Sequence, residues 1–343
     1  MSGRTPVRTG VVGFGYWGPN IVRNLDKLGD AELVVACDAN AANLARFSAL
    51  YPDVATTDDI CDMLAAHDLD AVVVATSAPS HFALAKLVLE AGKHCYVEKP
   101  LTLTSEDAEE LVRLAEEREL VLMVGHLMVY HSAVNYIKDV IGSGTLGDVL
   151  YLYSQRLNLG KVRTEENAFW SLAPHDVSIV HYLLDEIPSQ VSATGAAYLN
   201  GGVEDTVFAN LHFPSGRMAN IHVSWLDPHK TRKFTIVGSK KMLVFDDMQA
   251  TEKVWIYDKG VEPKEALGYG EDLTLRFGDI SVPYLHMAEP LALEIQHFLD
   301  CCTTGQVPRS DGRDGLAVVR VLEAVDESMR QGGAPVSTGL PES

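Results

Sequence analysis

Residues 9–20, TGVVGFGYWGPN, contain the pattern that decides the fold: an apolar run followed by Gly-x-Gly-x-x-Gly at positions 13–18. The apolar run is typical of a buried strand, and Pro19 is favoured in the first turn of a helix. At such a junction, Gly13 permits a tight turn, Gly15 lets the backbone approach a pyrophosphate, and Gly18 allows close packing of helix on strand. The helix N-terminus then offers N–H groups to phosphates. The turn residues predicted to contact a dinucleotide are Gly13, Gly15, Tyr16, Trp17 and Gly18.

The alternation of strand and helix patterns continues through the first 125 residues. Apolar runs rich in Val and flanked by turn residues are typical of parallel strands buried on both faces. These runs are residues 9–13, 32–38, 70–77, 94–100 and 120–125. Helical patterns lie between them, and one starts at Thr104 with the spacing of a capping box. The alternation predicts an α/β Rossmann domain with a doubly wound parallel sheet.

The end of the second predicted strand indicates which dinucleotide is bound. Asp38 lies there, 25 residues after Gly13. A carboxylate at this place can accept hydrogen bonds from the adenine-ribose hydroxyls and would repel a 2′-phosphate. The following Ala39 and Asn40 supply no guanidinium for such a phosphate. The sequence therefore predicts NAD rather than NADP, and the alternative is a solvated aspartate at a strand end.

Two further turns follow predicted strands, at the edge where open parallel sheets bind ligands. In TSAPSH, residues 76–81, small polar side chains suit the nicotinamide ribose, whereas His81 could equally be an ordinary helix-start histidine. In Glu98-Lys99-Pro100, a cis bond before the proline would fix Lys99 at the mouth of the cofactor cleft. The residues predicted to contact the cofactor here are Thr76, Ser77, Pro79, His81 and Glu98.

From about residue 148 the pattern changes to long alternating stretches separated by turn residues. Such alternation is typical of antiparallel strands with one covered face. The stretches are residues 149–159, 190–199, 205–213, 217–225, 233–239, 241–247 and 253–258, and helical patterns near 289–304 and 314–331 close the chain. We predict a Rossmann domain over residues 1–127 and, over 128–343, an α+β domain with a large open, mainly antiparallel sheet. An exposed sheet face would form a homo-oligomer, either a dimer or a tetramer.

Composition limits the class of protein. A length of 343 residues suits two domains, and the net charge of −19 argues against nucleic acid or an anionic membrane surface as partner. The first residues lack the apolar core of a signal peptide, and no apolar run reaches membrane-spanning length. The five scattered cysteines show no metal spacing and suit a reducing compartment. These features predict a soluble cytoplasmic protein without a metal site.

The glycine-rich turn, the small polar turn at 76–81 and Glu98-Lys99-Pro100 together resemble the Gfo/Idh/MocA oxidoreductase family. The resemblance spans essentially the whole chain and implies that Lys99 lies beside the nicotinamide and the reacting carbinol. It also implies a histidine in the same cleft, matched by His175, which we expect to act as general base or to exchange roles with Lys99. Ser171 stands where the aspartate of the family's Asp-xxx-His pair usually stands. The alternative for His175 is a helix-capping or core histidine.

Further segments resemble one branch of that family, which oxidises the C3 hydroxyl of UDP-linked N-acetylglucosamine or its uronic acid to a 3-keto sugar in amino-sugar biosynthesis. The segments are residues 156–160, 163–170 and 224–228. Arginine suits phosphate or carboxylate, asparagine suits hydroxyl or N-acetyl groups, and aromatic rings suit a sugar face or uracil. The predicted substrate residues are Tyr130, Arg156, Asn158, Arg163, Asn167 and Trp170. Their alternative role is to stabilise loops under the sheet.

Two other functions compete with this one. The same apparatus could act on a free sugar, a sugar phosphate or a cyclitol. A different class is a non-catalytic sensor that binds NAD(H) to regulate a partner. Lys99 and His175 disfavour the sensor, because a binding module needs neither residue.

Overall fold

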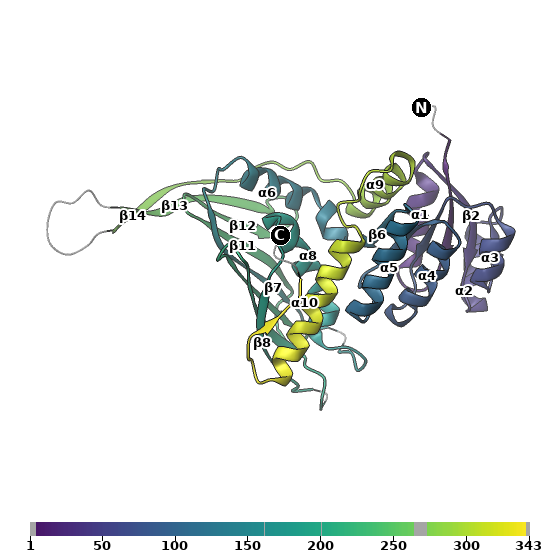
Figure 1. Cartoon of the computed structure of the whole chain (residues 1–343). Helices are drawn as coiled ribbons and strands as arrows, with labels where there is room; N and C mark the ends of the chain where they lie inside the picture. The colour runs from purple at the N-terminus through teal and green to yellow at the C-terminus, as the bar shows by residue number, and fades with distance from the viewer. Residues whose placement is uncertain (1–4, 161, 200, 264–272, 341–343) are drawn as a thin grey trace. The chain divides into compact units, whose positions relative to one another are not determined.

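The computed structural model describes residues 5–160, 162–199, 201–263 and 273–340, which form two compact units (Figure 1). Unit 1 comprises Met1–Tyr130 and Ala288–Val319, and unit 2 comprises His131–Met287 and Arg320–Ser343. The sequence assigned residues 288–319 to the second domain, whereas in the structure they pack within unit 1. The division is therefore not a single cut near residue 127.

The sheet of unit 1 is parallel throughout and has six strands. Their order is β3 (Ala55–Thr57), β2 (Ala31–Cys37), β1 (Val7–Val12), β4 (Ala71–Val74), β5 (His94–Glu98) and β6 (Leu122–Gly125). The strand order reverses between β1 and β4, which creates the switch point where ligands of such sheets bind. This confirms the predicted doubly wound sheet. The sequence missed the three-residue β3, which lacks an apolar run.

The helices of unit 1 lie where the sequence places turn and capping residues. They are α1 (Gly18–Lys27), α2 (Ala41–Leu50), α3 (Ile60–Ala66), η1 (Ala78–Ser80), α4 (His81–Glu90), α5 (Ser105–Glu117), η2 (Leu127–Tyr130) and α9 (Pro290–Thr304). The Thr104 side chain caps α5 by accepting a 3.2 Å hydrogen bond from the Asp107 N–H, as predicted.

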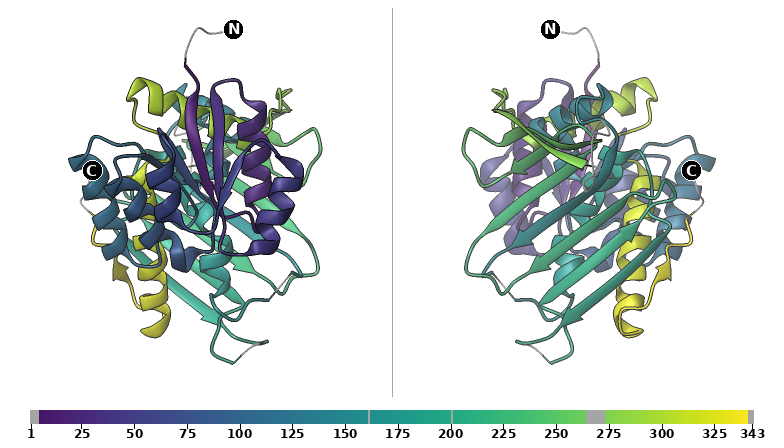
Figure 2. Two further views of the ribbon diagram at one scale, coloured as in Figure 1. Left: turned by 90° about the vertical axis from the view of Figure 1, so that its right-hand side faces the viewer. Right: turned by 90° about the vertical axis from the view of Figure 1, so that its left-hand side faces the viewer.

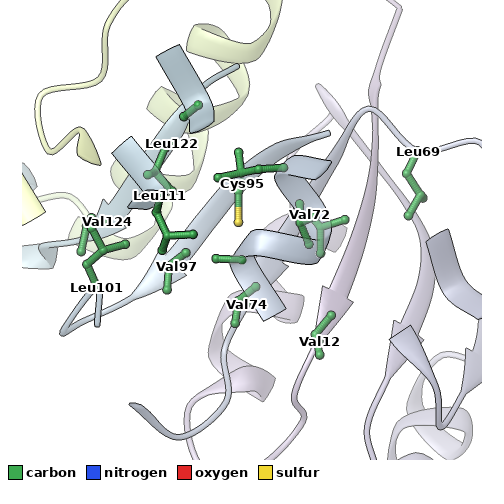
Figure 3. Packing of buried hydrophobic residues seen from close by; sticks show 14 of the residues in the cluster. Val12, Leu69, Val72, Val74, Cys95, Val97, Leu101, Leu111, Leu122 and Val124 are labelled. Atoms are coloured by element: carbon green, nitrogen blue, oxygen red, sulfur yellow. The ribbon is translucent and has the colours of Figure 1, made fainter. Parts of the chain in front are cut away.

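Both faces of this sheet are covered, which explains the valine-rich strands. Val72 and Val74 point to one face and pack with Leu111 and other buried residues of α3, α4 and α5 (Figure 3). On the other face, the Tyr96 ring lies 5.8 Å from the ring of Phe298 in α9. Because that second face also needs an apolar cover, α9 belongs to unit 1 although it follows the second sheet in the chain.

Unit 2 contains a nine-stranded mixed sheet. Its order is β14 (Leu273–Ser281), β13 (Val254–Pro263), β12 (Met242–Asp246), β11 (Thr231–Gly238), β7 (Val149–Leu157), β10 (Met218–Ser224), β9 (Thr206–His212), β8 (Gln190–Ala196) and β15 (Val336–Ser337). Among the strands that the structure describes, only the β7–β10 pair is parallel, so the predicted, mainly antiparallel sheet is confirmed. The sequence missed β14 and β15.

One face of this sheet is covered and the other is open. On β7, Tyr151 and Tyr153 are exposed, whereas Leu152 and Ser154 are buried. The helices of this unit are α6 (Ser132–Gly142), α7 (Ala168–Leu172), α8 (Pro174–Leu184) and the second part of α10 (Gly312–Arg330). The right-hand view of Figure 2 looks onto the face that no helix of the described chain covers. Across the described ranges, every helix is too short or too polar to cross a bilayer.

Candidate active site

The glycine-rich turn has the shape that phosphate binding requires. Gly13 has a φ of +99°, and a Cβ on Gly18 would lie 2.2 Å from the Gly13 carbonyl oxygen, so neither position tolerates a side chain. Around Gly15, by contrast, no described atom outside residues 14–16 lies within 4 Å of where a Cβ would be. The backbone there is open to a pyrophosphate, and α1 starts three residues later with its N–H groups facing this turn. Tyr16 is 95% exposed.

Asp38 connects the end of β2 to this turn. Its Oδ2 accepts hydrogen bonds from the Phe14 N–H at 2.7 Å and from the Asn43 Nδ2 at 3.0 Å, while Oδ1 accepts from the Asn40 N–H at 2.8 Å. A carboxylate can accept about four hydrogen bonds. One acceptor position therefore remains for a ribose hydroxyl, so the residues fit NAD.

Arg46, on α2, is a residue that sequence reasoning missed. Its Nη2 donates hydrogen bonds to the carbonyl oxygens of Phe14 and of Gly15, the latter at 3.1 Å, and its guanidinium lies 4.9 Å from the centre of the Phe14 ring. These contacts hold the glycine-rich turn from the α2 side. Arg46 lies inside a helix, eight residues beyond Asp38, and belongs to no sequence motif. Nothing in the sequence therefore indicated its contact with the glycine-rich turn.

His81 joins the turns after β4 and β5. Its Nδ1 lies 2.7 Å from the Pro100 carbonyl oxygen and its Nε2 lies 3.2 Å from that of Thr76. The residue is 1% exposed, and burial lowers the pKa of its imidazole. This arrangement agrees with the alternative interpretation of His81 as a helix-start histidine, because both ring nitrogens contact backbone carbonyl oxygens of the two turns. Ser77 and Pro79 in the same turn are exposed.

The turn after β5 carries the predicted catalytic lysine. The Lys99–Pro100 peptide bond is cis, the isomer considered in the sequence analysis. Next to it, the Glu98 carboxyl accepts hydrogen bonds from the Tyr96 hydroxyl at 3.3 Å and from the Trp17 side chain, and burial raises its pKa to about 7 although Lys99 opposes this. Unit 1 thus brings the glycine-rich turn, Asp38, the 76–81 turn and Lys99 to the carboxyl edge of one parallel sheet.

Arg156 lies in unit 2 and does not present a free guanidinium. Its Nε and Nη2 donate to Oδ2 and Oδ1 of Asp176 at 2.8 and 3.0 Å, and the two residues are 6% and 1% exposed. This bidentate, buried ion pair joins β7 to α8. In this structure the carboxylate partner of Arg156 is Asp176, and its contact with a phosphate or carboxylate of the substrate stays a prediction.

Asn167 and Trp170 are likewise engaged within unit 2. The Asn167 Oδ1 caps α7 by accepting from the N–H groups of Phe169 and Trp170, and its Nδ2 donates to Asp326 at 2.8 Å. The Trp170 indole donates to the other oxygen of Asp326 at 2.7 Å. Both polar atoms of the Asn167 side chain therefore have partners within unit 2, and its contact with a hydroxyl or N-acetyl group stays a prediction.

Tyr130 lies in the core of unit 1. Tyr130 is 2% exposed, and its hydroxyl shares a 3.0 Å hydrogen bond with Ser310. Its ring centre lies 5.5 Å from that of His297 and 5.9 Å from the guanidinium carbon of Arg309. The ring has no exposed face in this structure, and its contact with a sugar or uracil stays a prediction. Sequence reasoning could not separate a buried tyrosine in an apolar run from one lining a cleft.

Three predicted residues of unit 2 keep the properties of substrate or catalytic groups. Asn158 follows β7 directly, and its buried Oδ1 accepts no hydrogen bond from the part of the chain that the structure describes. Arg163 is half exposed and pairs with Glu166 at 2.7 Å. His175 is partly exposed at the second position of α8. Since the neighbouring Asp176 turns to Arg156, it does not take the place of the aspartate replaced by Ser171.

Known proteins resemble this chain over nearly its whole length. The UDP-N-acetylglucosamine 3-dehydrogenase of Acidithiobacillus ferrooxidans is 29% identical over 324 residues, which are 93% of this chain and 95% of that protein. The solved structure of that Acidithiobacillus enzyme, GnnA, superposes on this chain with a TM-score of 0.80 at 26% identity. The superposition covers 96% of this chain and 99% of the GnnA chain. The myo-inositol 2-dehydrogenase of Thermotoga maritima is 24% identical over 336 residues, 95% of this chain and 97% of that protein.

Family models match both halves of the chain. Residues 7–126 match the oxidoreductase family with an NAD-binding Rossmann fold, and residues 134–244 match the GFO/IDH/MocA C-terminal domain. Unit 1 accordingly contains an NAD-binding Rossmann domain. Both domain models match this chain, and a relative aligns with it over nearly the full length of both proteins. This chain is therefore an NAD-dependent oxidoreductase that belongs to the Gfo/Idh/MocA family.

Proposed function

We propose that the protein oxidises the C3 hydroxyl of a nucleotide-linked sugar of the UDP-N-acetylglucosamine type to a 3-keto sugar. The observation that carries this proposal is the similarity, over 93% of this chain, to a UDP-N-acetylglucosamine 3-dehydrogenase. The 3-keto product would suit a following transamination in amino-sugar biosynthesis, and the reaction would take place in the cytoplasm.

Cofactor binding uses groups of unit 1. The N–H groups at the start of α1 would hold the pyrophosphate, Asp38 the adenine ribose, and Thr76, Ser77 and Glu98 the nicotinamide end. Bound NAD supplies the acceptor for one hydride. The remaining task of the protein is to orient the carbinol and to remove its proton.

Two side chains share that task in our proposal. Lys99 donates a hydrogen bond to the carbinol oxygen and stabilises the negative charge that develops there. His175 accepts the hydroxyl proton while hydride leaves the carbon, so that one C–H and one O–H bond break and a C=O bond forms. Two electrons leave with the hydride, and the proton stays on the imidazole until it passes to water.

Substrate recognition would use Asn158 and Arg163. The Asn158 Oδ1 is a buried acceptor that calls for an N–H or O–H donor, such as an N-acetyl amide or a sugar hydroxyl. The Arg163 side chain is about half exposed and pairs with the Glu166 carboxylate. A diphosphate could bind the same guanidinium beside Glu166 or in its place.

A second candidate is a dehydrogenase of a free sugar, sugar phosphate or cyclitol. The full-length similarity to an inositol dehydrogenase favours it. Formation of NADH should be followed with UDP-N-acetylglucosamine, unlinked N-acetylglucosamine and myo-inositol, and the product mass should fall by two hydrogens. Turnover of only an unlinked compound would replace the first proposal with the second.

We also propose that the open sheet face forms a homo-oligomer. Cross-strand neighbours Tyr151 and Met218 are exposed on this face, as are Tyr153 and Phe208. Such a contiguous apolar and aromatic patch is typical of a contact between copies. Tyr153→Glu should reduce the mass measured by light scattering to that of a monomer, and an unchanged mass would reject this face as the interface.

A further inference from the structure

Glu294 is a buried carboxyl that the proposed mechanism does not use. It lies on α9 in unit 1 with 1% exposure, and neither of its oxygens accepts a hydrogen bond of normal geometry from a described residue. An ionised carboxylate in such surroundings is very unfavourable, so the group should keep its proton. Burial, reinforced by the charge of Glu98, raises the pKa of Glu294 well above its ordinary value.

The Tyr96 hydroxyl connects this group to the turn that carries Lys99. The hydroxyl donates to Glu98 at 3.3 Å. The Tyr96 ring packs against Phe298, which lies one turn after Glu294 on α9, with 5.8 Å between the ring centres, and Tyr96 and Glu294 each affect the pKa of the other. A tyrosine has only one hydrogen to donate. If both carboxyls were ionised they would compete for it, whereas a protonated Glu294 can donate to the tyrosine oxygen and leave that hydrogen to Glu98.

Gly125 provides the space for this arrangement. It is the direct partner of Glu98 in the β5–β6 register. A Cβ at this position would lie 2.7 Å from the Tyr96 hydroxyl oxygen and 3.1 Å from Oε2 of Glu98. A residue with a side chain would therefore displace both groups. The strand next to β5 is thus shaped around the Tyr96–Glu98 contact.

We propose that Glu294 is a positioning residue, which donates its proton to the Tyr96 oxygen and thereby directs the Tyr96 hydrogen to the Glu98 carboxylate. Glu98 also accepts from Trp17 of the glycine-rich turn and adjoins Lys99 in sequence. The chain Glu294–Tyr96–Glu98–Trp17 therefore ties α9 to both the cofactor turn and the lysine turn. The titratable groups that face it are Lys99 and Tyr130.

This inference rests on the proposed role of the Glu98-Lys99 turn in cofactor and substrate binding. The first test of the inference requires neither bound cofactor nor bound substrate. At about pH 9, above the pKa of about 7 that Glu98 has, a protonated carboxyl should still give its C=O stretch in the infrared spectrum. Glu294→Gln should remove this band. A spectrum in which Glu294→Gln removes no protonated-carboxyl band would overturn the inference, even if no nucleotide sugar were oxidised.

The second test compares a conservative with an apolar variant. Glu294→Gln keeps an N–H donor for the Tyr96 oxygen, so NAD affinity should stay within about twofold of wild type. Glu294→Met keeps the volume but not the donor, so affinity should fall by about threefold while thermal stability holds or rises. A residue with only a packing role would lose stability and affinity together in Glu294→Met, and that result would contradict the proposal.

The third test asks whether Glu294 acts through Tyr96. Tyr96→Phe removes the bridging hydroxyl and should weaken NAD binding by about fivefold. Adding Glu294→Met to Tyr96→Phe should then cost nothing further, because the relay is already broken. A double variant that loses the product of the two single effects would show that Glu294 acts by another route.

A pH titration separates the two charge states of Glu294. Glu294→Gln should leave the midpoint of the pH dependence of NAD binding unchanged, because a neutral acid is replaced by a neutral amide. If Glu294 carried a charge in the wild type, its removal would lower the pKa of Glu98 and move the midpoint to lower pH. That shift would overturn the proposal.

Discussion

The backbone N–H of Phe14 donates a 2.7 Å hydrogen bond to the Asp38 carboxylate, so the residue expected to bind the adenine ribose also anchors the phosphate-binding turn. If Asp38 binds the ribose as expected, one carboxylate both contacts the adenosine and fixes the turn that holds the pyrophosphate. Its loss should disturb the turn and the ribose contact together.

We expect Asp38→Ala to weaken NAD binding by about tenfold or more, since it removes a charged acceptor of several hydrogen bonds. Adding Ala39→Arg should raise affinity for NADP, because a guanidinium can meet the 2′-phosphate. Isothermal titration with both dinucleotides measures each change. A wild-type enzyme that already prefers NADP would refute the role given to Asp38.

Removing one partner of the buried Arg156–Asp176 pair should destabilise unit 2 strongly. Asp176→Ala leaves an uncompensated buried guanidinium, at a cost of about 3–5 kcal/mol in the free energy of unfolding. Chemical denaturation measures this loss. Glu327→Ala, at a partly exposed carboxylate of unit 2 paired with Arg330, is the matched control and should cost less than about 1 kcal/mol. Equal losses in the free energy of unfolding would mean that the buried pair stabilises the fold no more than an exposed pair does.

The acid cluster at the start of α10 should make stability depend on pH. Burial, together with the charge of Asp311, raises the pKa of Asp314 from 3.8 to about 7. The folded state thus binds a proton that the unfolded state has lost between about pH 4 and 7, so this residue lowers stability as pH rises through that range. We expect Asp314→Asn to raise the melting temperature by roughly 2–4 °C at about pH 8 and to leave it nearly unchanged at about pH 4. An equal rise at both values would exclude this titration as the cause.

Arg163 tests the nucleotide-sugar assignment. If it meets phosphate, Arg163→Ala should raise KM for the nucleotide-linked sugar by about tenfold and leave KM for the unlinked sugar nearly unchanged. Steady-state kinetics with both compounds gives the ratio. Glu166→Ala is a useful companion, because it frees the guanidinium from its present partner and should not weaken binding. Equal effects of Arg163→Ala on both sugars would indicate a structural role.

The sequence predicted most of the fold because local patterns and global layers agree. Valine-rich runs indicated strands buried on both faces, and the alternation of Tyr151, Leu152, Tyr153 and Ser154 agrees with a sheet covered on one face. What failed was the assignment of α9 to the second domain. Its burial against the first sheet is set by contacts such as Tyr96 with Phe298, which are remote in sequence and leave no local signal.

The residues predicted to bind the cofactor each lie on a motif at a strand end, so local sequence places them at one edge of the sheet. The predicted substrate residues lie on no such motif. Arg156, Asn167 and Tyr130 have suitable chemistry, yet each is engaged by a distant partner, Asp176, Asp326 or Ser310. No local pattern indicated that Glu294 is buried, because a glutamate in an amphipathic helix is usually exposed.

The central claim is that Lys99 stabilises the reacting carbinol, and Lys99→Met tests it most directly. Methionine keeps much of the stem's volume but removes the charge and the N–H donors. NAD affinity should stay near that of wild type, because the glycine-rich turn and Asp38 hold the cofactor. Single-turnover formation of NADH should slow by a factor on the order of 100 or more. A Lys99→Met enzyme that binds NAD and forms NADH at the wild-type rate would contradict the account.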